Sequence, residues 1–495
     1  GDYGDNRVEQ QLRSGALSPQ AFITEVAKVG DFYVVEGDSL WGMPRKITGD
    51  FVAHQTRPNP GDIRQVFLDS PGGPIFTRAL DAVRHAQREW TPQADVAFGY
   101  VLKSVSKPLY MTTLALVRDN LADFKQVFIN GQLPQGYVLD GLYLCASNVA
   151  IAADNDEMAH SFLAPQYIAK ALNFISSART GSVLPLYLLC SDGALLTYRF
   201  PKTSSLYDWT SRAHLERTHL LQGSLTVSDY VRRLAGAGEL SIRVTSEVWG
   251  RKERVTLHWL PKRAPHAFAD DPYFHSFCGP LFFYPDDAAR YAQGLVAPFK
   301  GTQYLGAVLV PGETAGYVAI DPVEDQGTGS TSTLALLFWI DHAGFDVPPG
   351  NVLSTYKIAA VQSFYKAIAS TSSREPLDIK LLENFVAKDD LRDYLAVVKR
   401  NAPEGARCYL SCRGGALLKY LPVHSAAETT LLAPGEAPDP SVWISRLRAL
   451  GILSVLVSDS FWTREGVLGE EWKVSEVQAE PHVDEYWYVH TKDEL

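Results

Sequence analysis

The chain has 495 residues, more than a single hydrophobic core usually holds, and a formal net charge of −10. Its residues are 46% hydrophobic, 11% aromatic and 21% charged, which is the composition of a globular protein. The acidic balance argues against nucleic acid as the main partner, because a phosphate-binding surface normally shows a basic excess. No apolar run reaches the length of about 18 residues that a membrane span needs.

The sequence contains an internal repeat. Gly73-Pro74-Ile75-Phe76 recurs as Gly279-Pro280-Leu281-Phe282, at an offset of 206. The same offset relates Asp81, Arg84 and Gln87 to Asp287, Arg290 and Gln293. A second block, residues 188–198, recurs as residues 410–420 at an offset of 222. The second copy has therefore gained residues between the blocks, and we place part of the gain in the helical stretch 384–399.

A third block occurs three times, and each occurrence predicts a capped short helix, a glycine stop and a strand that ends in tryptophan. It starts near Ser18, Ser228 and Asp439 and leads to Trp41, Trp249 and Trp462. The second block contributes two equivalent cysteines, Cys190 and Cys412. We interpret these tryptophans and cysteines as markers of a repeated core. A shared functional thiol is the alternative for the cysteines, and a role in an interface is the alternative for the additional tryptophans Trp443, Trp472 and Trp487.

The repeats divide the chain into four parts. Residues 1–55 form the tail of an upstream unit, residues 60–262 and 270–475 form two full units, and residues 476–495 form a C-terminal tail. In each full unit we expect an opening helix (80–90, 286–295), two strands (99–102 and 138–145, 306–310 and 334–340), a central helix (165–175, 355–368) and a hairpin (186–200, 408–421). Such a mixture predicts an α+β fold or a layered α/β fold.

This order of elements resembles that of the JAB/JAMM (Mov34-type) domain. The opening helix carries Asp-Ala-x-Arg, beginning at Asp81 and Asp287, and the late hairpin runs from Tyr187 to Tyr198 in the first unit. The most similar variety is the JAB-like domain of bacterial polymorphic and secretion-associated toxins. The resemblance implies two tandem JAB-like mixed sheets with helices, each extended by the helix-and-tryptophan block.

The resemblance also implies a zinc site made of an upstream Glu, a His-x-His pair and a later Asp, with the fourth zinc position left to water. This chain departs from that pattern at each point. Val96 and Gln303 stand at the Glu position, and no His-x-His occurs. In place of the histidine pair the copies offer Asp140-Gly141-Leu142 and Asp341-His342, and in place of the Ser and Asp step they offer residues 163–166 and 353–356. We therefore predict no catalytic residue, no metal ligand and no cofactor.

Other reactive residue types have structural interpretations. Cys278 lies close to His275, but its equivalent in the first copy is Gly72, so we expect a core thiol. Asp286-Asp287 and Asp389-Asp390 fall at the start of predicted helices, where carboxylates favour the helix dipole. Five cysteines, few and odd in number, favour reduced thiols over a disulfide framework.

The chain ends in Lys492-Asp493-Glu494-Leu495, which matches the retrieval signal of proteins resident in the endoplasmic reticulum. An ER resident, a secreted bacterial toxin that uses host retrieval, and a chance match all explain this ending. We expect a non-catalytic tandem pseudoenzyme, a binding or structural module of a larger bacterial effector or toxin, with a protein as its partner. It would reside in the bacterial cytoplasm before secretion, or in the host ER if the signal is used. The alternative is an active hydrolase or host-targeted toxin with an unrecognised site. The sequence assigns no oligomeric state.

Overall fold

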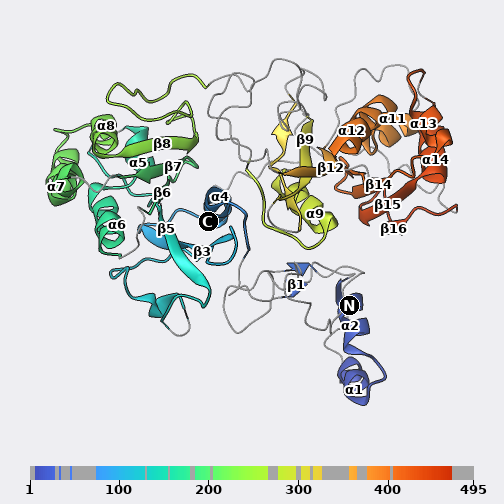
Figure 1. Ribbon diagram of the computed structural model, residues 1–495, viewed down its shortest axis with the longest axis horizontal. Helices are drawn as coiled ribbons and strands as arrows, with labels where there is room; N and C mark the ends of the chain where they lie inside the picture. Colours follow the sequence, from blue (N-terminus) through green and yellow to red (C-terminus); the bar gives the residue numbers. More distant parts are fainter. Residues whose placement is uncertain are drawn as a thin grey trace. The chain divides into compact units, whose positions relative to one another are not determined.

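The computed structural model describes residues 6–27, 33–34, 45–46, 74–128, 131–153, 156–178, 184–200, 204–265, 277–296, 303–312, 316–325, 356–364, 376–401, 405–436 and 438–470. These residues form two mixed β-sheets with accompanying helices, which confirms the predicted mixed α+β class (Figure 1). None of the helices in the described ranges combines the length and apolar character that crossing a bilayer requires.

Compactness divides the chain into two units. The first comprises the described residues within 1–295, 306–322 and 332–358, and the second those within 296–305, 323–331 and 359–495. The boundaries 60–262 and 270–475 follow the sequence repeat, which a division by compactness does not test. They stay predictions, as do the tails 1–55 and 476–495.

The first sheet has six strands in the order β4-β3-β5-β6-β7-β8. The strands are β3 (Ala97–Ser104), β4 (Tyr110–Thr112), β5 (Tyr137–Cys145), β6 (Leu186–Leu189), β7 (Leu195–Arg199) and β8 (Glu239–Val244). Only the β5–β6 pair is parallel. A parallel pair needs a long crossover, and helices α5 (Glu157–Ser161) and α6 (Pro165–Ser177) provide it.

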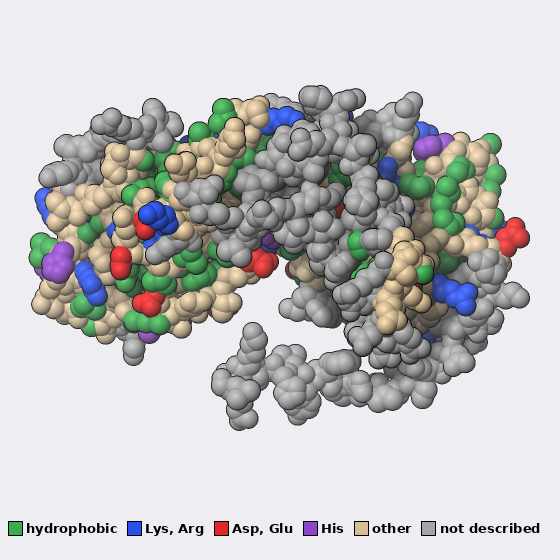
Figure 2. Space-filling view, turned by 90° about the horizontal axis from the view of Figure 1, so that it is seen from below, with side chains coloured by type: hydrophobic (Ala, Val, Ile, Leu, Met, Phe, Trp, Pro, Cys, Tyr) green, Lys and Arg blue, Asp and Glu red, His purple; other side chains and the backbone are tan. Residues whose placement is uncertain are grey.

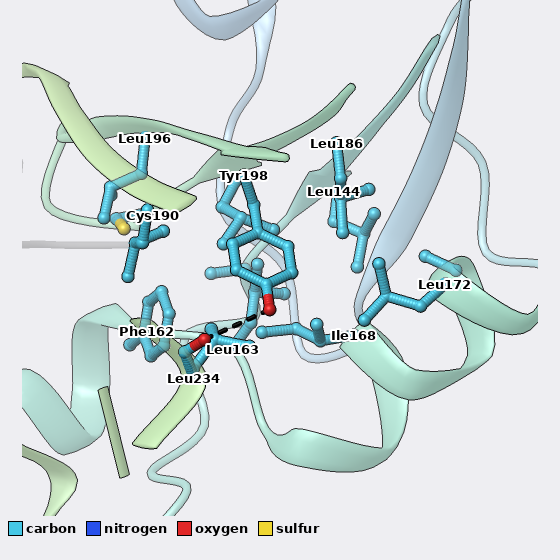
Figure 3. Packing of buried hydrophobic residues seen from close by; sticks show 14 of the residues in the cluster. Leu144, Phe162, Leu163, Ile168, Leu172, Leu186, Cys190, Leu196, Tyr198 and Leu234 are labelled. Carbon is cyan, nitrogen blue, oxygen red and sulfur yellow. Dashed lines mark hydrogen bonds between the residues drawn. The ribbon is translucent and has the colours of Figure 1, made fainter. Parts of the chain in front are cut away.

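Both faces of the first sheet are covered, so its central strands are buried on both sides. Helices α6, α7 (Ser204–Leu221) and α8 (Val227–Ala237) pack on one face (Figure 1). Helix α4 (Ala79–Glu89) packs on the other. Helix α6 begins with a proline at its first turn and buries Ile168, Leu172 and Ile175 at helical spacing. Ile168 and Leu172 face strand residues such as Leu144 and Leu186 (Figure 3).

The second sheet has the order β10-β9-β12-β13-β14-β15-β16, and β11 also pairs with β9. The strands are β9 (Tyr304–Val310), β10 (Val318–Ala319), β11 (Val323–Glu324), β12 (Lys357–Phe364), β13 (Arg407–Ser411), β14 (Leu417–Leu421), β15 (Ile452–Val457) and β16 (Gly466–Val467). From β10 to β15 the strand order is that of the first sheet, and β12–β13 is again parallel. Gly193 and Gly415, at the turns of the two equivalent hairpins, have φ angles of 89° and 104°, which favour glycine.

One predicted element of the second repeat unit, residues 270–475, is wrong. The stretch 355–368 was expected to be a helix, but Lys357–Phe364 is strand β12. Seven of its eight residues are buried, so its sequence lacks the alternation that identifies a half-exposed strand. The expected strand 334–340 lies outside the described residues.

The position of the extra residues was also predicted wrongly. Strand β3 begins at Ala97 and β9 at Tyr304, whereas β5 begins at Tyr137 and β12 at Lys357, so the offset has grown from 207 to 220 before β12 starts. Helices α11 (Pro376–Glu383) and α12 (Lys388–Asn401) occupy the crossover between the parallel strands, as α5 and α6 do in the first sheet. Helix α12 is therefore the counterpart of α6 and not an insertion.

The third block folds as a helix followed by a strand at each occurrence. The helices are α2 (Pro19–Ala27), α8 and α14 (Pro440–Leu450), and the strands that follow are β1 (Tyr33–Val34), β8 and β15. The strands do not end in tryptophan as predicted, because Trp249 and Trp462 lie in the loops after β8 and β15. Trp41 lies outside the described residues. The remaining described elements are α1 (Asn6–Ser14), β2 (Arg45–Lys46), η1 (Phe124–Gln126), α9 (Pro285–Leu295) and α13 (Ala426–Leu432).

Candidate functional site

The recurring cysteines and tryptophans form the same buried contact in both sheets, which we call the hairpin lock: Cys190 with Trp249, and Cys412 with Trp462. All four side chains are at most 4% exposed. In the second sheet the Cys412 thiol and the Trp462 indole both donate to the carbonyl of Asn384, at 3.1 and 3.0 Å. In the second sheet the hairpin turn is thereby held against the loop that carries Trp462. In the first sheet the buried Trp249 indole N–H has no such acceptor among the described residues, so the two copies share the burial of the cysteine and the tryptophan but not this bond.

Burial raises the pKa of the Cys190 and Cys412 thiols well above the ordinary value, and the neighbouring Trp249 and Trp462 indoles oppose this only weakly. A buried thiol that stays protonated is a poor nucleophile, because the thiolate is the reactive form. The recurring thiols therefore act as small core groups and weak hydrogen-bond donors.

A carboxylate completes the hairpin lock, but it comes from opposite sides in the two sheets. In the first sheet Asp192, on the hairpin turn, accepts from the Ala194 amide at 3.2 Å and from the Ser246 hydroxyl at 2.6 Å. In the second sheet Asp459, on the tryptophan loop, accepts from the Ala416 amide at 3.1 Å and the Trp462 amide at 2.6 Å. The equivalent turn position is then glycine.

Gly414 leaves room for the Asp459 carboxylate. A Cβ atom at Gly414 would lie 2.3 Å from Asp459 Oδ2. The two sheets therefore satisfy the same turn amide with one carboxylate each, supplied by the turn in one case and by the loop in the other.

Because the carboxylate comes from the turn in one sheet and from the loop in the other, we predict strong coupling between the stability effects of substitutions at positions 414 and 459. We expect Gly414→Asp to destabilise the second unit by about 1–3 kcal/mol, because the new side chain meets a carboxylate. Asp459→Ser should cost a similar amount, about 1–3 kcal/mol, because it leaves buried amides without an acceptor. The double variant rebuilds the arrangement of the first sheet and should be more stable than the sum of the single effects. Urea unfolding of the four proteins measures the coupling, and simple additivity would contradict the exchange.

A tyrosine and a glycine also recur together beside the lock. The Tyr198 hydroxyl donates to the Leu234 carbonyl at 3.1 Å. In Figure 3, Leu163 lies near this bond and Cys190 lies to one side of the Tyr198 ring. A Cβ atom at Gly238 would lie 2.6 Å from that hydroxyl, and one at Gly451 would lie 2.3 Å from the Tyr420 hydroxyl. The glycine that ends each helix of the third block is needed because a tyrosine from the hairpin packs onto it.

Helix α4 and the residue before it, Arg78, carry a second group of polar residues. Arg78 and Asp81 form a double hydrogen bond at 2.6 and 2.8 Å, and Asp81, 1% exposed, accepts from the Cys278 amide at 3.0 Å. Burial raises the pKa of Asp81, against the opposing effects of Arg78 and the Cys278 amide. Asp81 thus fixes the segment before α9 to α4.

His85 and two arginines lie further along α4. His85 Nδ1 is 3.3 Å from the Tyr291 hydroxyl. Burial lowers the pKa of His85; the charge of Glu89 opposes this shift and that of Arg88 adds to it. Burial and the nearby Arg88 lower the pKa of Arg84 to about 10, which leaves this arginine charged at neutral pH. The imidazole is therefore neutral at pH 7, with the Tyr291 hydroxyl, Glu89 and Arg88 near it.

This environment predicts a pH dependence. The ordinary pKa of histidine is 6.5, and the folded value is lower, so the unfolded chain binds more protons below pH 6.5. The contribution of His85 to stability is present above that pH and is lost as the pH falls towards the folded pKa. We expect the drop in urea midpoint between pH 7.5 and pH 5.5 to be smaller in His85→Gln than in the unsubstituted protein. An unchanged drop would contradict the prediction, and His258→Gln, at an exposed position, is the control.

The other reactive residue types considered in the sequence have structural partners. Cys278 is 3% exposed, and burial raises the pKa of its thiol. Asp287 pairs with Arg290 at 2.9 Å in the first turns of α9, and Asp389 pairs with Arg392 at 2.7 Å in α12. These ion pairs stabilise the helix starts.

The described residues at the implied zinc positions do not fit a zinc ion. Val96 is 4% exposed within the main hydrophobic cluster, and Leu163 is fully buried there. The Gln303 amide donates to the Tyr394 hydroxyl at 3.1 Å. Asp140 is one carboxylate beside the charges of Lys103 and Arg199. Asp341 and His342 lie outside the described residues, and within the described ranges no three His, Cys, Asp or Glu side chains gather as metal ligands would.

Several residues of these contacts were not predicted from the sequence. Asp459 and Ser246 stand three residues before Trp462 and Trp249, and the third occurrence has Asp38 at the same distance from Trp41. This recurring polar position was the available signal. No sequence signal pointed to the pairing of residues on α4 with distant ones. The predicted C-terminal signal, Lys492 to Leu495, lies outside the described residues.

Comparison with protein-family models, curated proteins and solved structures finds no match for the chain.

On the face drawn in Figure 2, acidic and basic side chains of the described residues are interspersed.

Proposed function

We propose that the chain is a non-catalytic binding or structural module, a tandem JAB-like pseudoenzyme within a larger bacterial effector or toxin, with a protein as its partner. One observation carries the proposal: side chains that recur at equivalent positions contact one another inside the fold. Cys190 and Cys412 meet tryptophans, and Tyr198 and Tyr420 pack onto glycines. The recurring residues thus hold a hairpin in place.

The JAB-like part of the proposal is supported by the order of elements. Each sheet is preceded by a helix, α4 or α9, and contains one parallel pair whose crossover is helical. Each sheet then ends in a hairpin and a helix–strand block, with the same strand order over six strands. This is the order on which the resemblance was based, now with β12 as the counterpart of β5.

The pseudoenzyme part of the proposal is supported by the groups found at the implied zinc positions. A catalytic zinc needs three protein ligands around a shared point, with an open position for water. Val96 and Leu163 instead belong to the hydrophobic cluster of the first sheet. An apolar side chain cannot replace a ligand, so a metal-activated water is not expected there.

Metal retention tests the proposal. The full chain would be purified without chelators, incubated with excess zinc, dialysed and measured by elemental analysis. We expect far less than one zinc per chain, because ligands at the implied positions are replaced. One or two equivalents of retained zinc would contradict the non-catalytic role. A parallel sample of a zinc-binding protein checks that dialysis itself does not strip the metal.

A further inference from the structure

A short segment extends the edge of each sheet. Phe76 pairs with Tyr110 of β4 through two backbone hydrogen bonds of 2.8 Å. Phe282 pairs with Tyr317, next to β10, through bonds of 2.7 and 2.9 Å. Both phenylalanines end the recurring Gly-Pro-aliphatic-Phe motif, so the motif makes the same pairing in each sheet.

The two segments also bond to each other, through equivalent residues. The Leu281 amide donates to the Ile75 carbonyl at 2.7 Å, and these residues occupy the same position of the motif, 206 apart. His85 and Tyr291 are likewise 206 apart, with ring centroids at 6.2 Å. Contacts between equivalent residues are the signature of a two-fold relation. All four residues belong to the first compact unit.

One charged contact breaks this symmetry. Arg88 of α4 pairs with Asp321, with Nη1 3.2 Å from Oδ1 and a second contact from Nη2 to Oδ2. Both side chains are mostly withdrawn from solvent, at 25% and 19% exposure. The offset of 206 places Gly294 at the position equivalent to Arg88. Tyr110 and Tyr317 are equivalent because they pair with the equivalent residues Phe76 and Phe282. Their offset of 207 makes Leu114 the residue equivalent to Asp321.

We propose that the Gly-Pro-aliphatic-Phe segments, together with α4 and α9, form a pseudo-two-fold junction between unlike copies of the repeat, and that Arg88 and Asp321 select the unlike pair. A junction between two copies of the first repeat would place Arg88 of one against Leu114 of the other. A junction between two copies of the second repeat would place Asp321 of one against Gly294 of the other. Either arrangement withdraws a charge from water without a partner, which is costly. The partner of this surface is therefore the other copy within the chain.

A charge-swap cycle in the full chain tests the junction by hydrogen exchange. The Leu281 and Phe282 amides are bonded across it or beside it, so exchange of residues 277–283 reports on its opening. We expect Arg88→Asp and Asp321→Arg each to speed that exchange by about tenfold or more. The double variant R88D/D321R restores an ion pair in the reverse sense and should return exchange to within about twofold of the original.

Two controls separate the junction from general damage. Arg392→Asp breaks the more exposed pair with Asp389 in α12 and should leave exchange at residues 277–283 unchanged. Exchange of the hairpin 410–420, which belongs to the second compact unit, should be the same in all variants. The proposal is overturned if the single variants leave residues 277–283 unchanged, if the double variant shows no recovery, or if the hairpin loses protection together with the junction.

Discussion

Replacing Trp249 by alanine should destabilise the first unit by about 3–5 kcal/mol, the cost of removing a large buried aromatic side chain. Trp249 is fully buried and lies 5.1 Å from the Phe162 ring and 5.5 Å from the Trp259 ring, measured between centroids. Its removal leaves a cavity beside Cys190 and frees the hairpin turn. Differential scanning calorimetry would measure the loss as a lower melting temperature.

Two further substitutions, one at the equivalent tryptophan and one at an exposed leucine, are the comparisons for the stability loss of Trp249→Ala. Trp462→Ala should cost about as much in the second unit, roughly 3–5 kcal/mol, because Trp462 is 1% exposed and contacts Phe385 and Phe461. Leu257→Ala removes a side chain that is 66% exposed and should change the melting temperature little. A small effect of both tryptophan substitutions would show that the third block is not part of the two cores.

Gly238→Ala is expected to destabilise the first unit by about 1–3 kcal/mol through overpacking. The new Cβ atom would lie 2.6 Å from the Tyr198 hydroxyl and 2.8 Å from the Arg199 carbonyl oxygen. The carbonyl belongs to the backbone of β7, so it cannot move aside as a flexible side chain could. Urea unfolding monitored by tryptophan fluorescence would measure the change.

Gly236→Ala provides a matched control two residues earlier in the same segment. The nearest atom to its new Cβ would be Leu257 Cδ2 at 3.4 Å, an ordinary contact. Because alanine is favoured over glycine in a helix by up to about 1 kcal/mol, this variant should be neutral or slightly more stable. Equal destabilisation by both substitutions would mean that helix geometry, and not the tyrosine contact, makes Gly238 necessary.

Local patterns in the sequence predicted most elements of the first unit. Helix α4, strands β3 and β5, helix α6 and the β6–β7 hairpin all appear where apolar periodicity or turn residues indicated them. Strand β12 was missed because its buried residues, four apolar ones followed by Gln362 and Ser363, do not alternate with exposed ones, so periodicity could not identify a strand. The error then displaced the inferred insertion onto α12.

Tertiary contacts were harder to predict, for a physical reason. Burial of Trp249 and Cys190 could be expected from residue type and recurrence. The exchange between Asp192 and Asp459 could not, because each carboxylate depends on a residue distant in sequence. The same holds for Arg88 and Asp321, which are 233 residues apart. Pairing across such separations is set by the packed fold and leaves no local pattern.

The central claim is that both sheets contain the same hairpin lock, and hydrogen exchange of the unsubstituted chain tests it in one experiment. The Cys190 amide donates to the Ala194 carbonyl at 2.9 Å, and the Cys412 amide to the Ala416 carbonyl at 2.8 Å. We predict that both amides exchange among the slowest in the protein, since a locked turn opens only with its core. Fast exchange at either amide, comparable to exposed loops, would contradict the claim that the recurring residues hold the two hairpins in the same way.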